Sequence, residues 1–284
     1  MKLAFLGLGR MGRELASHII ADGTYDVTVW NRTPSKTASC VGLGAKPAQT
    51  AADAVRDAEI VVTCLFGPQS VQEVVLDGHL PWSQNTLWMD VSTVGPAMAR
   101  QCARWADDLG LAYVQAPVLG SLGPAKAGDL GALIGSADAD VRAIARQLSS
   151  LWADPQRIVE YDEAGKAAAG KLLVNYGLAI GMQGLIEACR IGEAGGLTPQ
   201  EAVALAQLPK TPLSIIATMK GGALLSDTYT DTQFSTNLLA KDVALMLETA
   251  GSEDLSALRA AQTSLQRACQ TGHGEDDFSV MAAS

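Results

Sequence analysis

KLAFLGLGRMG, residues 2–12, is a short apolar run that passes directly into glycines at positions 7, 9 and 12. The run predicts a strand over Lys2–Leu6, and the periodicity after it predicts a helix over Arg10–Asp22. A G-x-G-x-x-G pattern that leaves a strand and opens a helix is typical of a loop that binds a dinucleotide pyrophosphate. The alternative is a strand–helix turn that merely favours glycine. We therefore expect a cofactor to contact Gly7, Leu8, Gly9, Arg10, Met11 and Gly12, with the amides of the helix N-terminus facing the phosphates.

The end of the second predicted strand, Asp26–Trp30, bears on which dinucleotide binds. A site for NAD(H) usually has an acid here, which accepts hydrogen bonds from the ribose hydroxyls. This chain has Asn31 and Arg32 instead, and a guanidinium suits the 2′-phosphate of NADP(H). Thr33 and Lys36 could add to the same pocket. The sequence thus predicts NADP(H) in preference to NAD(H); the alternative is that Arg32 stacks on the adenine and discriminates little.

Strand and helix patterns alternate through the first half of the chain. Further strands are predicted at residues 59–65, 86–91, 112–116 and 130–134. Helices are predicted between them, at residues 71–76, 96–109 and 138–151. Such alternation indicates βαβ units and a mostly parallel sheet. We expect an α/β Rossmann domain over residues 1–162.

The pattern changes after about residue 162, where strand candidates nearly vanish. Residues 163–193 predict one long helix, and later helices are expected at Pro199–Ala206, 237–250 and 255–271. The expected fold is thus an α/β Rossmann domain plus an all-α C-terminal domain, residues 163–284, joined by a long interdomain helix. Residues 274–277 (GEDD) are expected to form an exposed acidic turn.

Composition argues against several classes of protein. The 284 residues suit two domains, and a net charge of −9 without a basic tract argues against nucleic-acid binding. The five cysteines and three histidines lack disulfide or ligand spacing, so we expect no metal site, reduced thiols and a cytoplasmic protein. No signal peptide is apparent, and the longest apolar run, residues 172–186, falls short of a membrane span. We expect no membrane partner.

Polar or glycine-rich motifs follow two of the later strands, where ligands bind in open α/β sheets. Ser92 and Thr93 follow the strand at 86–91, and on spacing alone they are equally well helix caps. The segment APVLGS, residues 116–121, leads through a loop rich in glycine, proline and alanine to Asp129. Such a loop could bring backbone amides to a carboxylate, and a simple crossover turn is the alternative.

The segment AAAGKLLVN, residues 167–175, places a lysine among small apolar residues. On a helix, Lys171 and Asn175 share one face. A partly desolvated lysine has a lowered pKa and can give or take a proton. The alternative is a snorkelling lysine with a solvated head.

Together these motifs resemble the β-hydroxyacid dehydrogenase family over essentially the whole chain. The glycine loop, DVSTVGP at 90–96, APVLGS, GKAAAGKLLVN at 165–175 and Phe234 with Lys241-Asp242 stand in the family's order and spacing. The resemblance implies that Lys171 is the catalytic general acid and base. It implies a substrate site formed by Ser92, Gly120, Ser121, Asn175, Phe234 and Asp242. It further implies cofactor contacts at Leu65, Phe66, Gln69, Thr93 and Lys241.

One position departs from the family's pattern. Many members carry Ser-Gly-Gly where this chain has Leu119-Gly120-Ser121, so a substrate hydrogen bond is lost unless Ser121 supplies it. Glyoxylate/succinic semialdehyde reductases resemble the chain better at Ser121 and prefer NADPH. Imine reductases usually replace the lysine by an acid or a tyrosine, so Lys171 argues for carbonyl chemistry.

The sequence therefore predicts an NADP(H)-dependent oxidoreductase that interconverts a small aldehyde-acid and its hydroxy acid. Its expected partners are a small carboxylate substrate and a second copy of the chain, in a homodimer or higher homo-oligomer. The alternatives are 3-hydroxyisobutyrate dehydrogenase activity, an imine-reductase-like activity and a non-catalytic NADPH-binding sensor.

Overall fold

The computed structural model describes residues 1–283, which group into two compact units. Unit 1 is Met1–Lys171, and unit 2 runs from Leu172 onward. The division falls inside helix α8 (Ala164–Ala194), whose first turns pack with the sheet of unit 1. The boundary expected from the sequence, after residue 162, lies just before this helix.

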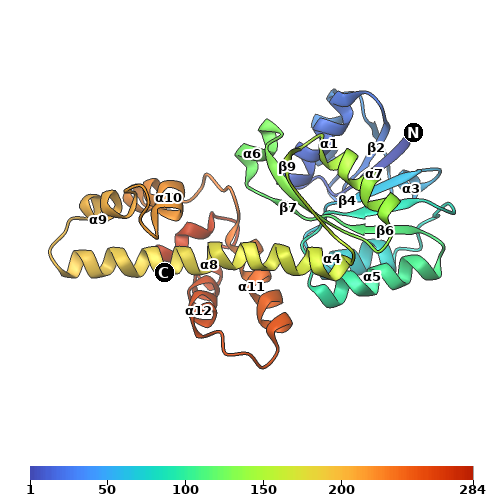
Figure 1. Cartoon of the computed structure of the whole chain (residues 1–284). Coiled ribbons are helices and arrows are strands. Elements are labelled where there is room, and N and C mark those ends of the chain that lie inside the picture. The colour runs from blue at the N-terminus through green and yellow to red at the C-terminus, as the bar shows by residue number, and fades with distance from the viewer. Residues whose placement is uncertain (284) are drawn as a thin grey trace. The chain divides into compact units, whose positions relative to one another are not determined.

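Unit 1 is built on a nine-stranded sheet (Figure 1). Its parallel part has the order β3-β2-β1-β4-β5-β6, and β8 and β7 continue it with antiparallel pairing. The strands are β1 (Lys2–Leu6), β2 (Asp26–Trp30), β3 (Lys46–Pro47), β4 (Ile60–Thr63), β5 (Leu87–Asp90), β6 (Ala112–Gln115), β7 (Val118–Leu119), β8 (Leu130–Gly135) and β9 (Ala153–Tyr161), which pairs with β8. The strand order reverses between β1 and β4, which is the switch point where doubly wound sheets bind ligands.

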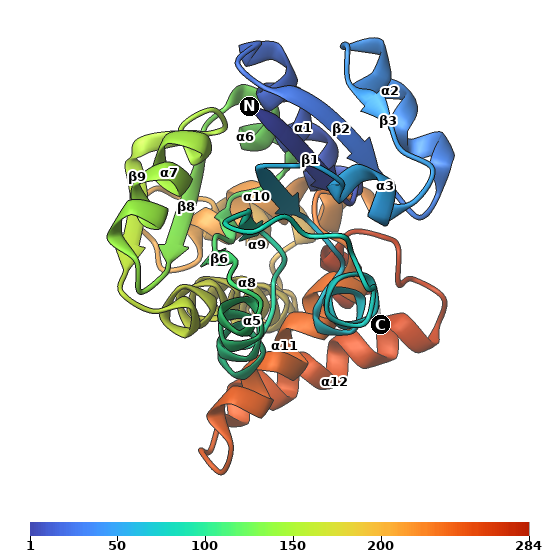
Figure 2. The same ribbon diagram turned by 90° about the vertical axis from the view of Figure 1, so that its right-hand side faces the viewer.

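Alternate side chains along the strands face two layers of helices. One face, with Phe5, Val29 and Met89, packs against α1 (Arg10–Asp22) and α7 (Ala139–Ser149). The other face, with Val61 and Trp88, packs against α3 (Ala51–Val55), α5 (Pro96–Asp108) and the start of α8. Figures 1 and 2 show helices on both sides of the sheet. This confirms the expected Rossmann architecture.

Shorter elements complete unit 1. After β2 come η1 (Pro34–Thr37) and α2 (Ala38–Gly42), which lie beside β3 at one edge of the sheet in Figure 2. After β4 come α4 (Pro68–Val71) and the π-helical turn η2 (Gln72–Leu76), and between β7 and β8 lies α6 (Leu122–Ala127).

The described part of unit 2 consists of helices, apart from one isolated bridge between Ser235 and Asp277. The helices are the rest of α8, α9 (Pro199–Ala206), α10 (Ser214–Ser226), α11 (Thr236–Ala250), α12 (Ser256–Gln270) and η3 (Phe278–Ala282). Their core is formed by Met182 and Leu185 of α8 with Leu239 of α11 and Leu265 of α12. The expected all-helical C-terminal domain is confirmed.

Three local expectations differ from the structure. Strand β9 was not expected, because most of its side chains are exposed and it carries no apolar run. Helix α10 was not expected either, since it is apolar nearly all round and contains Gly221-Gly222. The acidic turn was wrong at Asp277, which is buried and pairs with Lys220 of α10 at 2.8 Å.

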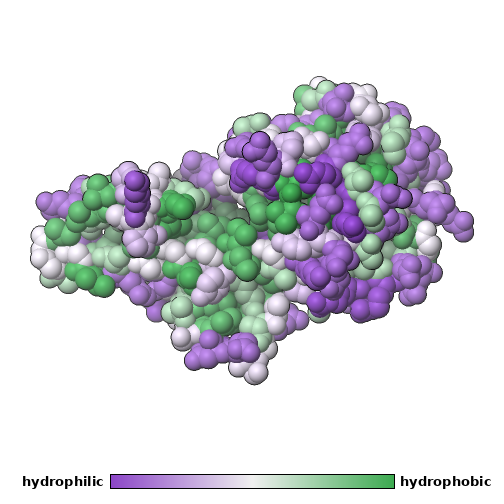
Figure 3. Space-filling model, viewed as in Figure 1, coloured by the Kyte–Doolittle hydropathy of each residue, from purple (hydrophilic) through white to green (hydrophobic). Residues whose placement is uncertain are grey.

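Helix α8 is, among the described residues, the one helix long and apolar enough by composition to cross a membrane. Ala164 and Ala168 are buried against the sheet, and Met182 and Leu185 are buried in the helical core. Helix α8 is therefore buried on part of its surface only. Figure 3 shows hydrophobic surface over unit 2, where Leu173, Ile191, Leu205, Ile215 and Met219 are exposed.

Candidate functional site

The glycine loop joins β1 to α1 beside the switch point. Gly7 has a φ of +102°, and a Cβ at Gly7 would collide with the carbonyl oxygen of Cys64. A Cβ at Gly12 would collide with the carbonyl oxygen of Gly7. A Cβ at Gly9, by contrast, would meet no protein atom within 4 Å. The backbone at Gly9 is therefore open to a ligand at the N-terminus of α1, which fits a pyrophosphate.

Asn31, directly after β2, braces this loop. Its Oδ1 accepts a hydrogen bond from the amide of Leu8 at 2.9 Å, and its Nδ2 donates to the carbonyl of Thr33 at 3.0 Å. Arg32 and Lys36 are exposed on the same turn, and residues 31–39 contain no acid. The turn therefore presents positive charge where an acid would favour NAD(H).

The segment after β4 lies next to the glycine loop. A Cβ added at Gly7 would lie 3.0 Å from the side chain of Leu65. Phe66 is 54% exposed, and the Gln69 side chain donates to Glu73 at the surface. The three predicted cofactor contacts of this segment thus lie at the edge of the sheet that carries the glycine loop.

Ser92 connects the ends of β4 and β5. Its Oγ accepts a hydrogen bond from the amide of Leu65 at 2.9 Å, and its own amide donates to Oδ1 of Asp90 at 3.0 Å. Ser92 is buried, and Thr93 is half-buried. Helix α5 is capped by Gly95 rather than by either hydroxyl, so the reading of Ser92 and Thr93 as helix caps is wrong.

The segment at residues 117–121 contains a short strand where the sequence predicted only a loop. Leu119 belongs to β7 and pairs with Gly131. Gly120 has a φ of +134°, a backbone conformation that other residues rarely adopt, and a Cβ there would also lie 2.7 Å from the Leu130 side chain, so glycine is favoured. Ser121 is half-buried at the start of α6, and its hydroxyl makes no capping hydrogen bond.

The course of α8 over unit 1 places Lys171. The helix starts against Gly135, where an added Cβ would lie 3.0 Å or less from Ala164 and Ala167. Gly135 is the register partner of Gln115 at the end of β6. The first turn of α8 therefore lies beside the carboxyl end of β6.

The next turn of α8 advances along β8. Gly170 lies against Leu133, whose amide donates to the carbonyl of Pro117 at 3.0 Å. Lys171 follows directly and is only 9% exposed. A buried cation thus lies near the segment at residues 117–121, at the edge of the sheet where ligands bind.

Three predicted site residues meet within unit 2. Nδ2 of Asn175 donates to Oδ2 of Asp242 at 2.5 Å, and Nζ of Lys241 lies 2.8 Å from Oδ1 of the same carboxylate. Asn175 and Asp242 are buried. The pairing joins α8 to α11, and Asn175 lies one helical turn beyond Lys171.

Phe234 lies two residues before α11 and is half-buried. Its ring contacts that of Phe278 with centroids 6.2 Å apart, and its amide donates to Oδ2 of Asp277 at 3.3 Å. Asp277 in turn pairs with Lys220. The sequence did not indicate that Asp277 and Lys220 support Phe234, since Asp277 follows the acids Glu275 and Asp276 in the chain.

Three further residues, Thr63, Asp90 and Gln115, are fully buried beneath Ser92 and were not among the site residues expected from the sequence. Each is a polar residue that ends an otherwise apolar strand. That interruption at the last strand position is the sequence signal that could have indicated them.

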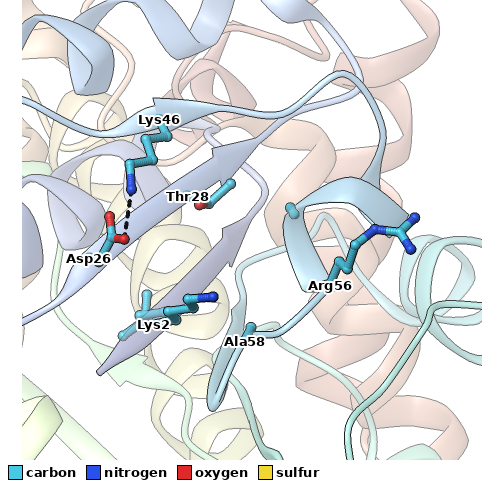
Figure 4. Close-up of a pocket in the computed structure, with 8 residues that line it drawn as sticks. Lys2, Asp26, Thr28, Lys46, Arg56 and Ala58 are labelled. Atoms are coloured by element: carbon cyan, nitrogen blue, oxygen red, sulfur yellow. Dashed lines mark hydrogen bonds and ion pairs between the residues drawn. The ribbon is translucent and has the colours of Figure 1, made fainter.

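A pocket of about 160 Å³ lies elsewhere in unit 1 (Figure 4). It is lined by Lys2, Asp26, Lys46 and Arg56, and Lys46 pairs with Asp26 at 2.6 Å. Lys2 and Asp26 begin β1 and β2, so the pocket lies at the amino edge of the sheet, opposite the glycine loop. It contains none of the predicted site residues, and we do not assign the site to it. Within residues 1–283, no three His, Cys, Asp or Glu side chains are grouped to hold a metal ion.

Two family descriptions match the chain in succession. The NAD binding domain of 6-phosphogluconate dehydrogenase matches residues 2–158. The NAD-binding region of NADP-dependent 3-hydroxyisobutyrate dehydrogenase matches residues 165–284.

Individual proteins match over nearly the whole chain. NAD-dependent L-serine dehydrogenase of Pseudomonas aeruginosa is 32% identical over 99% of this chain and 96% of its own. Glyoxylate/succinic semialdehyde reductase 2 of Arabidopsis thaliana is 29% identical over 99% of this chain and 78% of its own. The solved structure of Mycobacterium tuberculosis 3-hydroxyisobutyrate dehydrogenase with L-serine has a TM-score of 0.85 over 99% of this chain and 98% of its own, at 23% identity. The last likeness shows a shared fold.

Proposed function

Because the chain belongs to the β-hydroxyacid dehydrogenase family, we propose that it reduces a small aldehyde-acid to the hydroxy acid, reversibly, with NADP(H). The observation that carries the proposal is Lys171, a buried cation near the segment at residues 117–121 and one helical turn from Asn175. L-serine, glyoxylate and succinic semialdehyde, which appear in the names of the relatives, all bear a carboxylate.

The residues around the glycine loop fit the cofactor. The open backbone at Gly9 would hold the pyrophosphate, and Arg32 the 2′-phosphate. When bound, NADP(H) supplies the hydride. A non-catalytic sensor has no use for the buried lysine, so we favour an enzyme.

Ser92 and Ser121 would bind the substrate carboxylate. The amide of Leu65 already occupies an acceptor position on Ser92 Oγ, which leaves the hydroxyl hydrogen to donate to a ligand. Ser121 has a hydroxyl that the cap of α6 does not use. The Ser121 hydroxyl would replace the one that is missing at Leu119.

Lys171 would transfer the proton. During reduction its ammonium group polarises the carbonyl oxygen and gives that oxygen a proton, and in the oxidation the neutral amine takes the proton back. Nδ2 of Asn175 donates a hydrogen bond to Asp242. Its Oδ1 can therefore accept a hydrogen bond from Lys171 or from the substrate hydroxyl. The Asn175–Asp242 bond fixes that orientation.

A substrate panel tests the function. NADPH oxidation should be measured with glyoxylate, succinic semialdehyde, methylmalonate semialdehyde, tartronate semialdehyde and a cyclic imine, with L-serine and 3-hydroxyisobutyrate in the reverse direction. We expect turnover with at least one aldehyde-acid and none with the imine. Butanal is the matched control for succinic semialdehyde because it has a methyl group in place of the carboxylate. Absence of turnover with every compound would contradict the proposal.

The cofactor preference gives a second prediction. We expect kcat/KM with NADPH to exceed that with NADH about tenfold or more, since the charged hydrogen bond from Arg32 to the 2′-phosphate should contribute about 1.5–3 kcal/mol.

The glycine loop gives a further prediction. Gly9→Ala should weaken NADPH binding while Tm stays near the wild-type value, because its Cβ meets no protein atom within 4 Å. Gly12→Ala should instead lower Tm, since its Cβ collides with the Gly7 carbonyl. The outcome that would refute the first of these predictions is a clear preference for NADH, as in the NAD-dependent L-serine dehydrogenase relative. Arg32 would then not bind a 2′-phosphate.

The homodimer expected from the sequence remains part of this proposal, supported by the exposed apolar side chains of unit 2. Sedimentation velocity tests it against the 29.6 kDa of one chain.

A further inference from the structure

Three polar side chains form a row across the sheet, directly below the site. Thr63, Asp90 and Gln115 are the last residues of β4, β5 and β6, and Asp90 is the register partner of both others. Register partners on neighbouring strands point to the same face. All three are 0% exposed. We call them the polar row.

The first half of the polar row fixes the Asp90 carboxylate. The Thr63 hydroxyl donates to Oδ1 of Asp90 at 2.7 Å and accepts from Nε1 of Trp88 at 2.9 Å. The amide of Ser92 donates to the same Oδ1 at 3.0 Å. The carboxylate is thus tied both to β4 and to the segment that carries Ser92.

Gln115 supplies the second half. Its Nε2 donates to the carbonyl of Asp90 at 3.1 Å and to the carbonyl of Ser92 at 2.9 Å. Its Oε1 accepts from the Tyr113 hydroxyl at 2.7 Å. Burial and the nearby Asp90 charge raise the pKa of Tyr113, so the phenol stays protonated and remains a donor. Gln115 therefore holds the backbone on both sides of Val91 and is itself held in place.

Stability alone gives no reason to put these groups here. Burying polar groups is costly, and their net contribution when hydrogen-bonded is small, so apolar residues of the same shape would serve as well. The same strands begin with apolar Ile60 and Leu87. The three side chains of the polar row all stand at the strand ends next to Ser92, and their hydrogen bonds converge on residues 90–92.

We propose that Gln115 is a positioning residue. Together with Thr63 and Asp90, it orients the Ser92 hydroxyl toward the substrate carboxylate. This rests on the proposed function, in which Ser92 binds that carboxylate. Gln115 acts through backbone carbonyls and need not touch the substrate itself.

The test compares Gln115→Met with Thr86→Val. Methionine keeps the length of the side chain but removes both donors. Thr86 precedes β5 at the other end, is buried, and donates one hydrogen bond to the carbonyl of Ala58 at 3.0 Å, so Thr86→Val is a matched loss of a buried polar group far from the site. We expect Gln115→Met to raise KM for the carboxylate substrate about tenfold, with a smaller change in KM for NADPH. Thr86→Val should change neither.

Residue-level amide hydrogen exchange provides a readout without turnover. In Gln115→Met the amides of Leu65 and Ser92 should exchange faster than in wild type, and in Thr86→Val they should not. If Gln115→Met fails to fold, Tyr113→Phe removes only the hydroxyl that holds Gln115, and it should raise the substrate KM about threefold.

The outcomes separate the two proposals. If the wild type turns over but Gln115→Met or Tyr113→Phe keeps the wild-type KM and exchange rates, the role of Gln115 is refuted and the function stands. If the wild type turns over no carbonyl substrate, the function fails, and the exchange rates still decide whether Gln115 holds Ser92.

Discussion

Lys171→Ala lowers kcat by about 10²–10⁴-fold, the usual contribution of a positioned general acid or base. The dissociation constant for NADPH should stay nearly unchanged, because the glycine loop and Arg32 do not depend on this side chain. Single-turnover NADPH oxidation and a direct NADPH titration separate the two quantities. A lower kcat with an unchanged dissociation constant for NADPH would show that Lys171 acts on the reacting oxygen and does not bind the cofactor.

Lys166→Ala is the matched control for this variant. Lys166 lies on the same helix, five residues earlier, but its side chain is exposed and pairs with Asp162 at 2.6 Å. It should keep wild-type turnover. Lys171→Arg keeps the positive charge but cannot release a proton, so it separates polarisation from proton transfer. Near-normal turnover in Lys171→Ala would refute the assignment.

Lys220→Met destabilises unit 2 by about 3–5 kcal/mol, because removing one partner of a buried ion pair leaves an uncompensated charge. Lys220 and Asp277 are 5% and 3% exposed, and both carboxylate oxygens lie 2.8 Å from Nζ. Guanidinium unfolding followed by circular dichroism measures the loss. In Lys220→Met with Asp277→Asn most of the loss should be recovered, since the stranded charge is gone.

The pH dependence of this loss has a definite sign. Burial alone would raise the pKa of Asp277, but the hydrogen bond and charge of Lys220 outweigh it and hold that pKa below its usual value. In wild type the stabilisation is present above the unfolded pKa of about 3.9 and is lost as the pH falls through the lowered folded pKa. Without Lys220 the carboxyl becomes easier to protonate.

The difference in stability between wild type and Lys220→Met should therefore shrink as the pH is lowered toward 4. Lys46→Met is the control, because its pair with Asp26 is even shorter, at 2.6 Å, but is exposed and should contribute little at any pH. A loss that does not depend on pH would show that packing, rather than the charge on Asp277, sets the cost.

Much of unit 1 could be predicted from the sequence, because its signals are local. The glycine loop, β1, α1 and β2 lie where the pattern predicts them, since each is a short run bounded by its own turn residues. Strand β9 could not be predicted, because it is held by pairing with β8 and exposes most of its side chains. Helix α10 has no polar face to give it a helical period.

The candidate site divides in the same way. Lys171 and Asn175 can be recognised together because they are four positions apart on one helix. The bond from Asn175 to Asp242 spans 67 positions, and the pair of Lys220 with Asp277 spans 57, so no local pattern reports them. The polar row depends on strand register, which the sequence specifies only through the assembled sheet.

The seating of α8 on the sheet has a consequence for synthesis on the ribosome. Trp88 and Tyr113 share their core with Ala164 and Ala168, which are made well after β5 and β6. A nascent chain that ends before α8 leaves the part of this face beside α5 uncovered, however complete its strands are. Unit 1 can therefore be completed only after the start of α8 has emerged from the exit tunnel, and Lys171, the proposed acid and base, emerges with it.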